Sequence, residues 1–272
     1  MRQALEVLKP TRCIVRALAL FVVIGMLAGT AASAENPQIA KRKAAQRTSF
    51  SDAEIARGFF RTVFGAELGL EGRVDRVRKF EKPVRVFIEG HARPDRRKQV
   101  ETVLSDIGAH IPNIDIAVVE RFEDANYVVH LVRDRELAAT VRRMYGPKGR
   151  KIIRSLEPQC LSGFSKDAHY RIERSDVILV VDAGDFIFYD CAYEEMLQAL
   201  GPIRDDATVP WTMFNDKVQA GFFDIYDQFI LNILYDNRVR AGMTRKQMKA
   251  LLPQILPSVR EWIARKNGLP AP

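Results

Sequence analysis

Histidine and cysteine are scarce in this chain of 272 residues, which holds four histidines and three cysteines. A helix binds zinc through a histidine pair at i and i+4, and no two histidines have that spacing. The chain also lacks a Gly-x-Ser-x-Gly nucleophile motif, a phosphate-binding glycine loop and a dinucleotide-binding fingerprint. We therefore expect neither a serine hydrolase nor a nucleotide-dependent enzyme. The scattered histidines are more typical of surface or core positions than of metal ligands: His91, His110, His130 and His169.

Dense basic stripes with interleaved aromatic residues, which are typical of nucleic-acid binding, are also missing. The net charge is +8 for the whole chain and +5 without residues 1–34 (8 − 3), and the basic residues after that segment gather in short clusters at 41–43, 96–98 and 148–154. We expect no nucleic-acid partner. Anionic lipid head groups at a membrane surface, or envelope polymers, fit such clusters better, and a solvated surface is the simplest interpretation.

A long apolar run occurs only at the amino terminus. Residues 1–34 combine basic residues, the apolar run 17–29 and the ending Ala32-Ser33-Ala34, which is the pattern of a cleaved secretory signal peptide. The alternative is an uncleaved anchor, but the run is shorter than the ~20 residues that a spanning helix needs. No cysteine follows the run, so we do not expect a lipoprotein anchor. The predicted location is the periplasm or the exterior of the cell.

Cleavage would remove Cys13 and leave two cysteines, Cys160 and Cys191. Two cysteines in an exported chain most simply form one disulfide bond, and a pair of buried free thiols is the alternative. A disulfide would also leave neither cysteine free to act as a nucleophile.

After the signal peptide we expect a flexible basic leader at 35–50, one domain at 51–266 and a tail at 267–272. The fold class is α+β, with one mixed sheet and helices packed on it. The Ser51-Asp52-Ala53-Glu54 capping box predicts the start of a first helix. Further helices are predicted over 94–109 and 134–144 and around 222–233. A last helical region is expected from Thr244, broken by Pro253 and Pro257. Strands are predicted at 84–88, 114–119 and 127–132, followed by a long loop at 146–167 and a hairpin of 177–182 with 186–189.

The expected strand at 186–189 leads into the stretch around which the domain is organised. Apolar residues at 192, 196, 199 and 200 recur at helical spacing, and Gly201-Pro202 is typical of a helix end. Glu194 and Gln198 are four residues apart and share one face of this helix, and Glu195 lies on the adjacent face. Two adjacent glutamates early in a helix also have an ordinary explanation, because they interact favourably with the helix dipole.

This stretch resembles the metzincin metallopeptidase helix, whose pattern is H-E-x-x-H-x-x-G-x-x-H. Glu195 falls on the general-base glutamate and Gly201 on the turn glycine. The ligand histidines are replaced by Glu194, Gln198 and Arg204. Trp211-Thr212-Met213-Phe214 stands where that family has its methionine turn. The resemblance implies a zincin-like fold that has lost its histidine ligands.

The chain is also similar to a family of bacterial secreted proteins known as domain of unknown function 2927. The similarity is carried by three motifs, Glu194-Glu195-x-x-Gln198-Ala199-Leu200-Gly201, Met213-Phe214-Asn215-Asp216 and Leu234-Tyr235-Asp236 followed by Gly242-Met243. The resemblance extends back to about residue 51. That family implies no established activity.

Only oxygen ligands are available for a metal on this helix. Glu194, Gln198 and Asp205, or Asp206 or Asp216 in its place, would suit calcium, magnesium or manganese better than zinc. We favour a different hypothesis, in which the Arg204 guanidinium takes the place of the metal and forms hydrogen bonds with Glu194 or Glu195. No cofactor is then expected.

The leading interpretation is thus a non-catalytic exported protein that binds a peptide or an envelope polymer. The polar base of its binding cleft would be formed by Glu194, Glu195, Gln198 and Arg204, and the strand 186–189 would pair with an extended ligand. One alternative is a divergent metal-dependent hydrolase with Glu195 as general base. Another is a scaffold for envelope assembly that uses the basic surface at 96–98.

Overall fold

A five-stranded mixed sheet lies at the centre of the computed structural model, which describes residues 35–65, 74–155 and 160–271. The strand order is β2-β1-β3-β5-β4. Four strands are parallel, and β4 at one margin runs antiparallel to β5. The strands are β1 (Val84–Glu89), β2 (Ile116–Val118), β3 (Tyr127–Val132), β4 (Cys160–Lys166) and β5 (Ile172–Val180).

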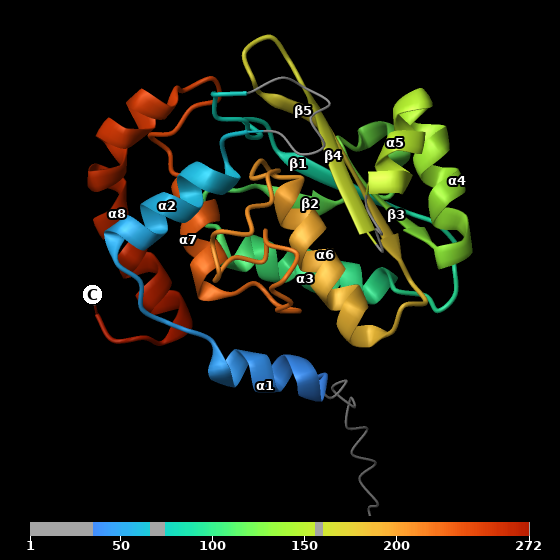
Figure 1. Ribbon diagram of the computed structural model, residues 1–272, viewed down its shortest axis with the longest axis horizontal. Coiled ribbons are helices and arrows are strands. Elements are labelled where there is room, and N and C mark those ends of the chain that lie inside the picture. Colours follow the sequence, from blue (N-terminus) through green and yellow to red (C-terminus); the bar gives the residue numbers. More distant parts are fainter. Residues whose placement is uncertain (1–34, 66–73, 156–159, 272) are drawn as a thin grey trace, which may run out of the picture. The chain divides into compact units, whose positions relative to one another are not determined.

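Every residue of β3 is buried, because this strand is central in the sheet and covered on both faces. The larger core lies on one face, where α3, α6, α7 and α8 supply most of the buried apolar side chains that come from helices. A smaller core lies between the other face and the pair α4 and α5 (Figure 1). The helices are α1 (Pro37–Ala45), α2 (Asp52–Thr62), α3 (Arg97–His110), α4 (Asp134–Tyr145), α5 (Pro147–Ser155), α6 (Asp185–Gln198), α7 (Ile225–Leu234) and α8 (Arg245–Asn267), with a 3₁₀ turn η1 (Phe122–Asp124).

The expected α+β organisation is confirmed, since residues from Glu35 onward form one compact unit with one mixed sheet. The capping box at α2 is present, with the Glu54 N–H donating to the Ser51 hydroxyl and the Glu54 carboxylate accepting from the Ser51 N–H. The predicted signal peptide at 1–34 lies outside the described residues. None of the helices in the described ranges is both long and apolar enough to cross a membrane.

Four expectations about secondary structure are wrong. The leader is not flexible throughout, because residues 37–45 form α1, whose Ile39 is buried. The expected long loop at 146–167 contains α5 and the whole of β4. Residues 186–189 belong to α6, so neither the hairpin nor the pairing edge proposed for them exists. Helix α8 continues through Pro253 and Pro257, since both rings are exposed while neighbouring side chains such as Leu256 hold the helix on the core.

The basic cluster at 96–98 is largely structural. Arg96 is buried and donates from Nε to the Val181 carbonyl oxygen, while its guanidinium pairs with Asp185. Arg97 donates to the Ile88 carbonyl oxygen at 2.7 Å. Two of the three cations therefore position α3 against the sheet and α6, which weakens the expectation that this cluster is a docking surface.

Candidate functional site

Helix α6 carries the residues that the sequence singled out. It begins at Asp185, after Gly184 turns the chain with φ of 99°. Its first turns contain aromatic residues that favour strands in isolation. The side chains of Phe188, Ala192 and Met196 nevertheless recur every four residues and are all buried in the larger core, which stabilises the helix instead.

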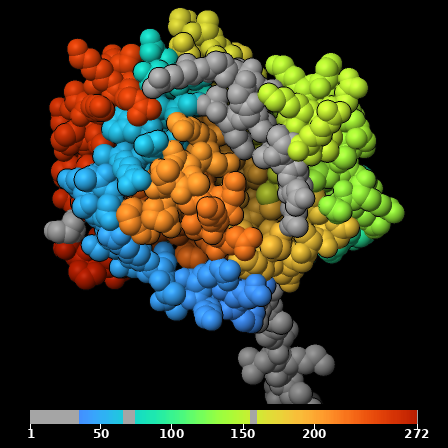
Figure 2. All heavy atoms as spheres, in the orientation of Figure 1, coloured from blue at the N-terminus to red at the C-terminus, as the bar shows by residue number. Residues whose placement is uncertain are grey.

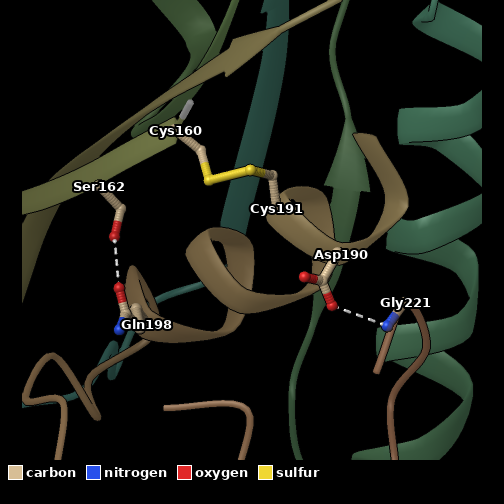
Figure 3. The surroundings of a disulfide bond; sticks show 6 residues. All are labelled: Cys160, Ser162, Asp190, Cys191, Gln198 and Gly221. Carbon is tan, nitrogen blue, oxygen red and sulfur yellow. Dashed lines mark hydrogen bonds between the residues drawn. A yellow bond between two sulfur atoms is a disulfide. The ribbon is translucent and has the colours of Figure 1, made fainter. Parts of the chain in front are cut away.

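A disulfide bond joins α6 to the margin of the sheet. Cys160 in β4 and Cys191 in α6 are bonded, with Cα atoms 5.8 Å apart, as the sequence predicted (Figure 3). Two residues farther along β4, the Ser162 hydroxyl donates to Gln198 Oε1 at 3.4 Å (Figure 3). The middle and the end of α6 are therefore both attached to β4.

Helix α6 is followed closely by Gly201, at a position that only glycine can occupy. Gly201 has φ of 141°, and a Cβ atom there would lie 2.4 Å from the carbonyl oxygen of Arg78. The chain then runs through residues 202–224 to α7, and this segment, in orange, is exposed at the centre of the face in Figure 2. The middle of this segment is held on α7 by Asp227. The Asp227 carboxylate accepts a hydrogen bond from the buried Met213 N–H at 2.7 Å and another from the Thr212 hydroxyl.

The segment 202–224 brings two aspartates close to Glu194. One carboxylate oxygen each of Glu194, Asp205 and Asp216 lies within 4.8 Å of the others, a distance at which one cation could contact all three. Glu194 and Asp205 are half-buried and Asp216 is exposed. The Gln198 amide donates to Asp205 at 2.5 Å, so Gln198 orients one aspartate of this group. We call Glu194, Asp205 and Asp216 the acidic cluster.

The electrostatics of the acidic cluster favour proton or cation uptake. Burial, followed by repulsion from Glu195 and Asp205, raises the pKa of Glu194 to about 10. Burial also raises the pKa of Glu195 to about 8, opposed by interactions with Ser162. One helical turn earlier, burial raises the pKa of Asp190 to about 6, although the Gly221 N–H donates to its carboxylate at 3.0 Å (Figure 3).

Arg204 does not take the position that we expected. Within the described residues, its guanidinium forms an ion pair with Asp206 at 3.6 Å, and it pairs with neither Glu194 nor Glu195. The backbone explains the difference, because the Arg204 N–H donates to the Thr62 carbonyl oxygen and so directs this residue toward α2. Asp206 also accepts hydrogen bonds from Thr208 and is not one of the three grouped carboxylates.

Sequence reasoning found Glu194, Gln198 and Asp205 and gave Asp216 only as an alternative. It assigned no role to Ser162, Asp190 or Asp227. Their sequence positions carry no motif, and only the disulfide prediction indicated that β4 lies against α6. The three carboxylates form an oxygen-only donor set, which suits calcium, magnesium or manganese. The Gln198 amide does not belong to that set, because its nitrogen faces Asp205 and its oxygen accepts from Ser162.

The fold and the site define a mixed α+β protein whose principal core helix ends beside a group of acidic side chains. The chain belongs to the family described as Protein of unknown function (DUF2927), which matches residues 52–254. No curated protein and no solved structure matches the chain.

Proposed function

We propose that the protein is an exported, non-catalytic binding protein that holds an extended peptide or an envelope polymer along β4. The observation that carries this proposal is the position of β4 at the margin of the sheet. It is held on α6 by the disulfide bond between Cys160 and Cys191 and by the contact of Ser162 with Gln198. Export rests on the signal-peptide pattern of residues 1–34.

A marginal strand presents backbone N–H and C=O groups that can pair with one more strand. Among the described residues, no strand pairs with the outer edge of β4. Ser165 is exposed, and Gly163, Phe164 and Lys166 are half-buried, so this end of β4 is accessible. An extended ligand added here would form main-chain hydrogen bonds with β4 and would lie beside the end of α6. The edge proposed from the sequence is thereby replaced by β4.

The polar residues of α6 favour binding over catalysis. The three positions that hold histidine in the metzincin pattern are Glu194, Gln198 and Arg204, and the amide of Gln198 is engaged with Asp205. Glu195 is buried and in contact with Ser162. A general base must reach the proton that it removes, and this glutamate faces the protein instead.

Hydrogen–deuterium exchange tests the proposal. The purified protein would be mixed with a library of extended peptides and, separately, with soluble peptidoglycan fragments. Bound ligand should slow exchange in residues 160–166 at least tenfold. Strand β2, the opposite margin of the same sheet, is the matched control and should not change. A peptide hit whose backbone nitrogens are methylated should lose binding. Protection of β2 alone, or full binding by the methylated peptide, would refute the proposal.

A second candidate function is hydrolysis with a divalent metal held by the acidic cluster and Glu195 as general base. It is favoured by the approach of three carboxylates to within 4.8 Å, one residue from the glutamate that matches the metzincin base. The residues fit an oxygen-preferring cation and not zinc. Manganese or calcium titration by calorimetry should show one site that Asp216→Asn removes. Peptidase activity retained by Glu195→Gln would contradict the catalytic role.

A further inference from the structure

A second cleft lies on the other face of the sheet, at the ends of β1 and β3. Its volume is about 850 Å³, and its walls are the carboxyl ends of these two strands and one side of α4. On α4 the lining residues Glu136, Ala139, Thr140 and Arg143 follow helical spacing and form one stripe. Helix α6 and the acidic cluster are packed on the opposite face, so this cleft is independent of the proposed function.

The cleft lies at the point where the sheet topology reverses. From β1 the chain passes through α3 to β2 on one side, and then returns to β3 on the other side of β1. The parallel strands β1 and β3 are neighbours, and their following segments diverge. In open sheets of this kind, ligands bind in the crevice outside the carboxyl ends of the strands at such a reversal.

The cleft contains basic groups that lack acidic partners. Arg133 follows β3 directly, and Arg143 lies on the stripe of α4. Within the described ranges, neither guanidinium is in an ion pair. The two carboxylates of the lining have partners within the cleft itself, and Glu136 also lies 4.0 Å from Arg135 Nε. Glu89 contacts His130 Nδ1 at 2.5 Å, and Glu136 accepts from the Arg133 backbone N–H at 3.0 Å. The lining holds three arginines, Arg133, Arg135 and Arg143, and two carboxylates, so its formal charge is +1 with the histidines neutral, which suits an anion.

The other lining groups indicate the rest of the ligand. His130 is fixed between two carboxylates, with Nε2 lying 3.2 Å from Asp176. Both ring nitrogens of His130 are thus occupied, so His130 positions the half-exposed Glu89 carboxylate. The remaining acceptor capacity of Glu89, together with the Thr140 hydroxyl, can hydrogen-bond a molecule that carries hydroxyl groups. The lining contains no phenylalanine, tyrosine or tryptophan, on which a nucleobase would stack.

We propose that this cleft binds a small phosphorylated sugar or polyol, with the phosphate at Arg133 and a hydroxyl group at Glu89. Guanidinium binds phosphate in a bidentate manner, and the position of Arg133 directly after β3 places it at the reversal of the sheet. Arg143 lies ten residues farther on, about 15 Å along the helix axis, and adds positive charge at the other end of the cleft.

Isothermal titration calorimetry on the purified protein tests the proposal with glucose 6-phosphate, glucose and inorganic phosphate as probes. The phosphorylated sugar should bind in saturable fashion, and glucose at least tenfold more weakly. Arg133→Ala should weaken binding of the phosphorylated sugar at least tenfold. Arg142→Ala is the matched control, because Arg142 is an exposed arginine of α4 outside the lining, and it should change Kd less than twofold.

Three outcomes would overturn the proposal. The first is the absence of saturable binding of the phosphorylated sugar at millimolar concentration. The second is equal affinity for glucose and glucose 6-phosphate. The third is equal weakening by Arg133→Ala and Arg142→Ala, which would indicate a general charge effect. Far-ultraviolet circular dichroism and thermal unfolding would establish that each variant is folded, and Arg133→Lys, which keeps the charge but not the bidentate geometry, should lose part of the affinity.

Discussion

The α-carbon of Gly201 lies so close to Arg78 that any side chain at this position would strike the main chain. A Cβ atom would be 2.4 Å from the Arg78 carbonyl oxygen and 2.9 Å from Leu234 Cδ2. The φ of 141° is also unfavourable for any other residue. We predict that Gly201→Ala lowers the free energy of unfolding by about 3 kcal/mol or more, measured by urea denaturation.

Gly268→Ala is the control for this prediction. Gly268 ends α8 with φ of 64°, and nothing lies within 4 Å of a Cβ built there. The substitution should lower the free energy of unfolding by only about 1 kcal/mol, because alanine must adopt the left-handed conformation but meets no other atom. Equal stability of the two alanine variants would mean that the close approach of Gly201 to the Arg78 carbonyl oxygen does not affect the free energy of unfolding.

Removing the disulfide bond should destabilise the protein without unfolding it. Cys160 and Cys191 are 31 positions apart, and closing a loop of that length in the unfolded chain corresponds to about 3–4 kcal/mol. We predict a loss of that size in the Cys160→Ser, Cys191→Ser double variant, measured by urea denaturation. The reduced parent protein is the matched control and should lose the same amount. A loss below about 1 kcal/mol in both would mean that β4 and α6 are held together by their other contacts.

Residue patterns were sufficient to predict elements whose sequence shows one clear periodicity. Helix α3 was predicted because Val100, Val103, Leu104 and Ile107 form one apolar face, and the structure buries all four. Strand β3 was predicted from its run of branched residues. The mixed organisation of the domain follows from such elements, because each has to bury an apolar side against another.

Other elements depend on contacts that no local pattern contains. Strand β4 includes Ser162, Gly163 and Ser165 and shows no alternation of apolar and polar residues, so pairing with β5 and the disulfide bond decide its conformation. The acidic cluster likewise joins residues 194, 205 and 216 through a segment without regular structure. The expected role of Arg204 is wrong because the hydrogen bond of its backbone N–H to the Thr62 carbonyl oxygen directs the residue toward α2, where its guanidinium pairs with Asp206.

Arg96 should be required for folding stability. It is buried, bonds to the Val181 carbonyl oxygen at 3.1 Å and lies over the Phe188 ring. Arg96→Ala leaves that carbonyl without a donor and removes packing, so we predict a loss of about 2 kcal/mol or more in the free energy of unfolding. Lys98→Ala, at an exposed position of α3, is the control and should change stability by less than about 0.5 kcal/mol. Thermal and urea unfolding of both variants would measure the difference, and equal effects would contradict it.

Asp224 should make stability depend on pH. It is buried at the start of α7, where its carboxylate accepts from the Asp227 N–H at 2.9 Å, and burial raises its pKa to about 6. An unfolded aspartate has a pKa of about 3.9, so between these values the folded state binds more protons than the unfolded state. The stabilisation from this group is therefore complete below about pH 4 and is lost as the pH rises through about 6.

Asp224→Asn removes the titrating proton and keeps a residue that caps helices well. We predict that this variant shows a flatter dependence of unfolding free energy on pH between about 4 and 6, with up to about 3 kcal/mol less change than the parent. Urea denaturation at intervals of half a pH unit would measure both slopes. Asp52→Asn is the control for the loss of a negative charge, because Asp52 is an exposed carboxylate in the first turn of α2, where it forms an ion pair with Arg260. An unaltered slope in Asp224→Asn would mean that other buried acids, among them the neighbouring Asp227, whose pKa is also raised by burial, dominate the dependence.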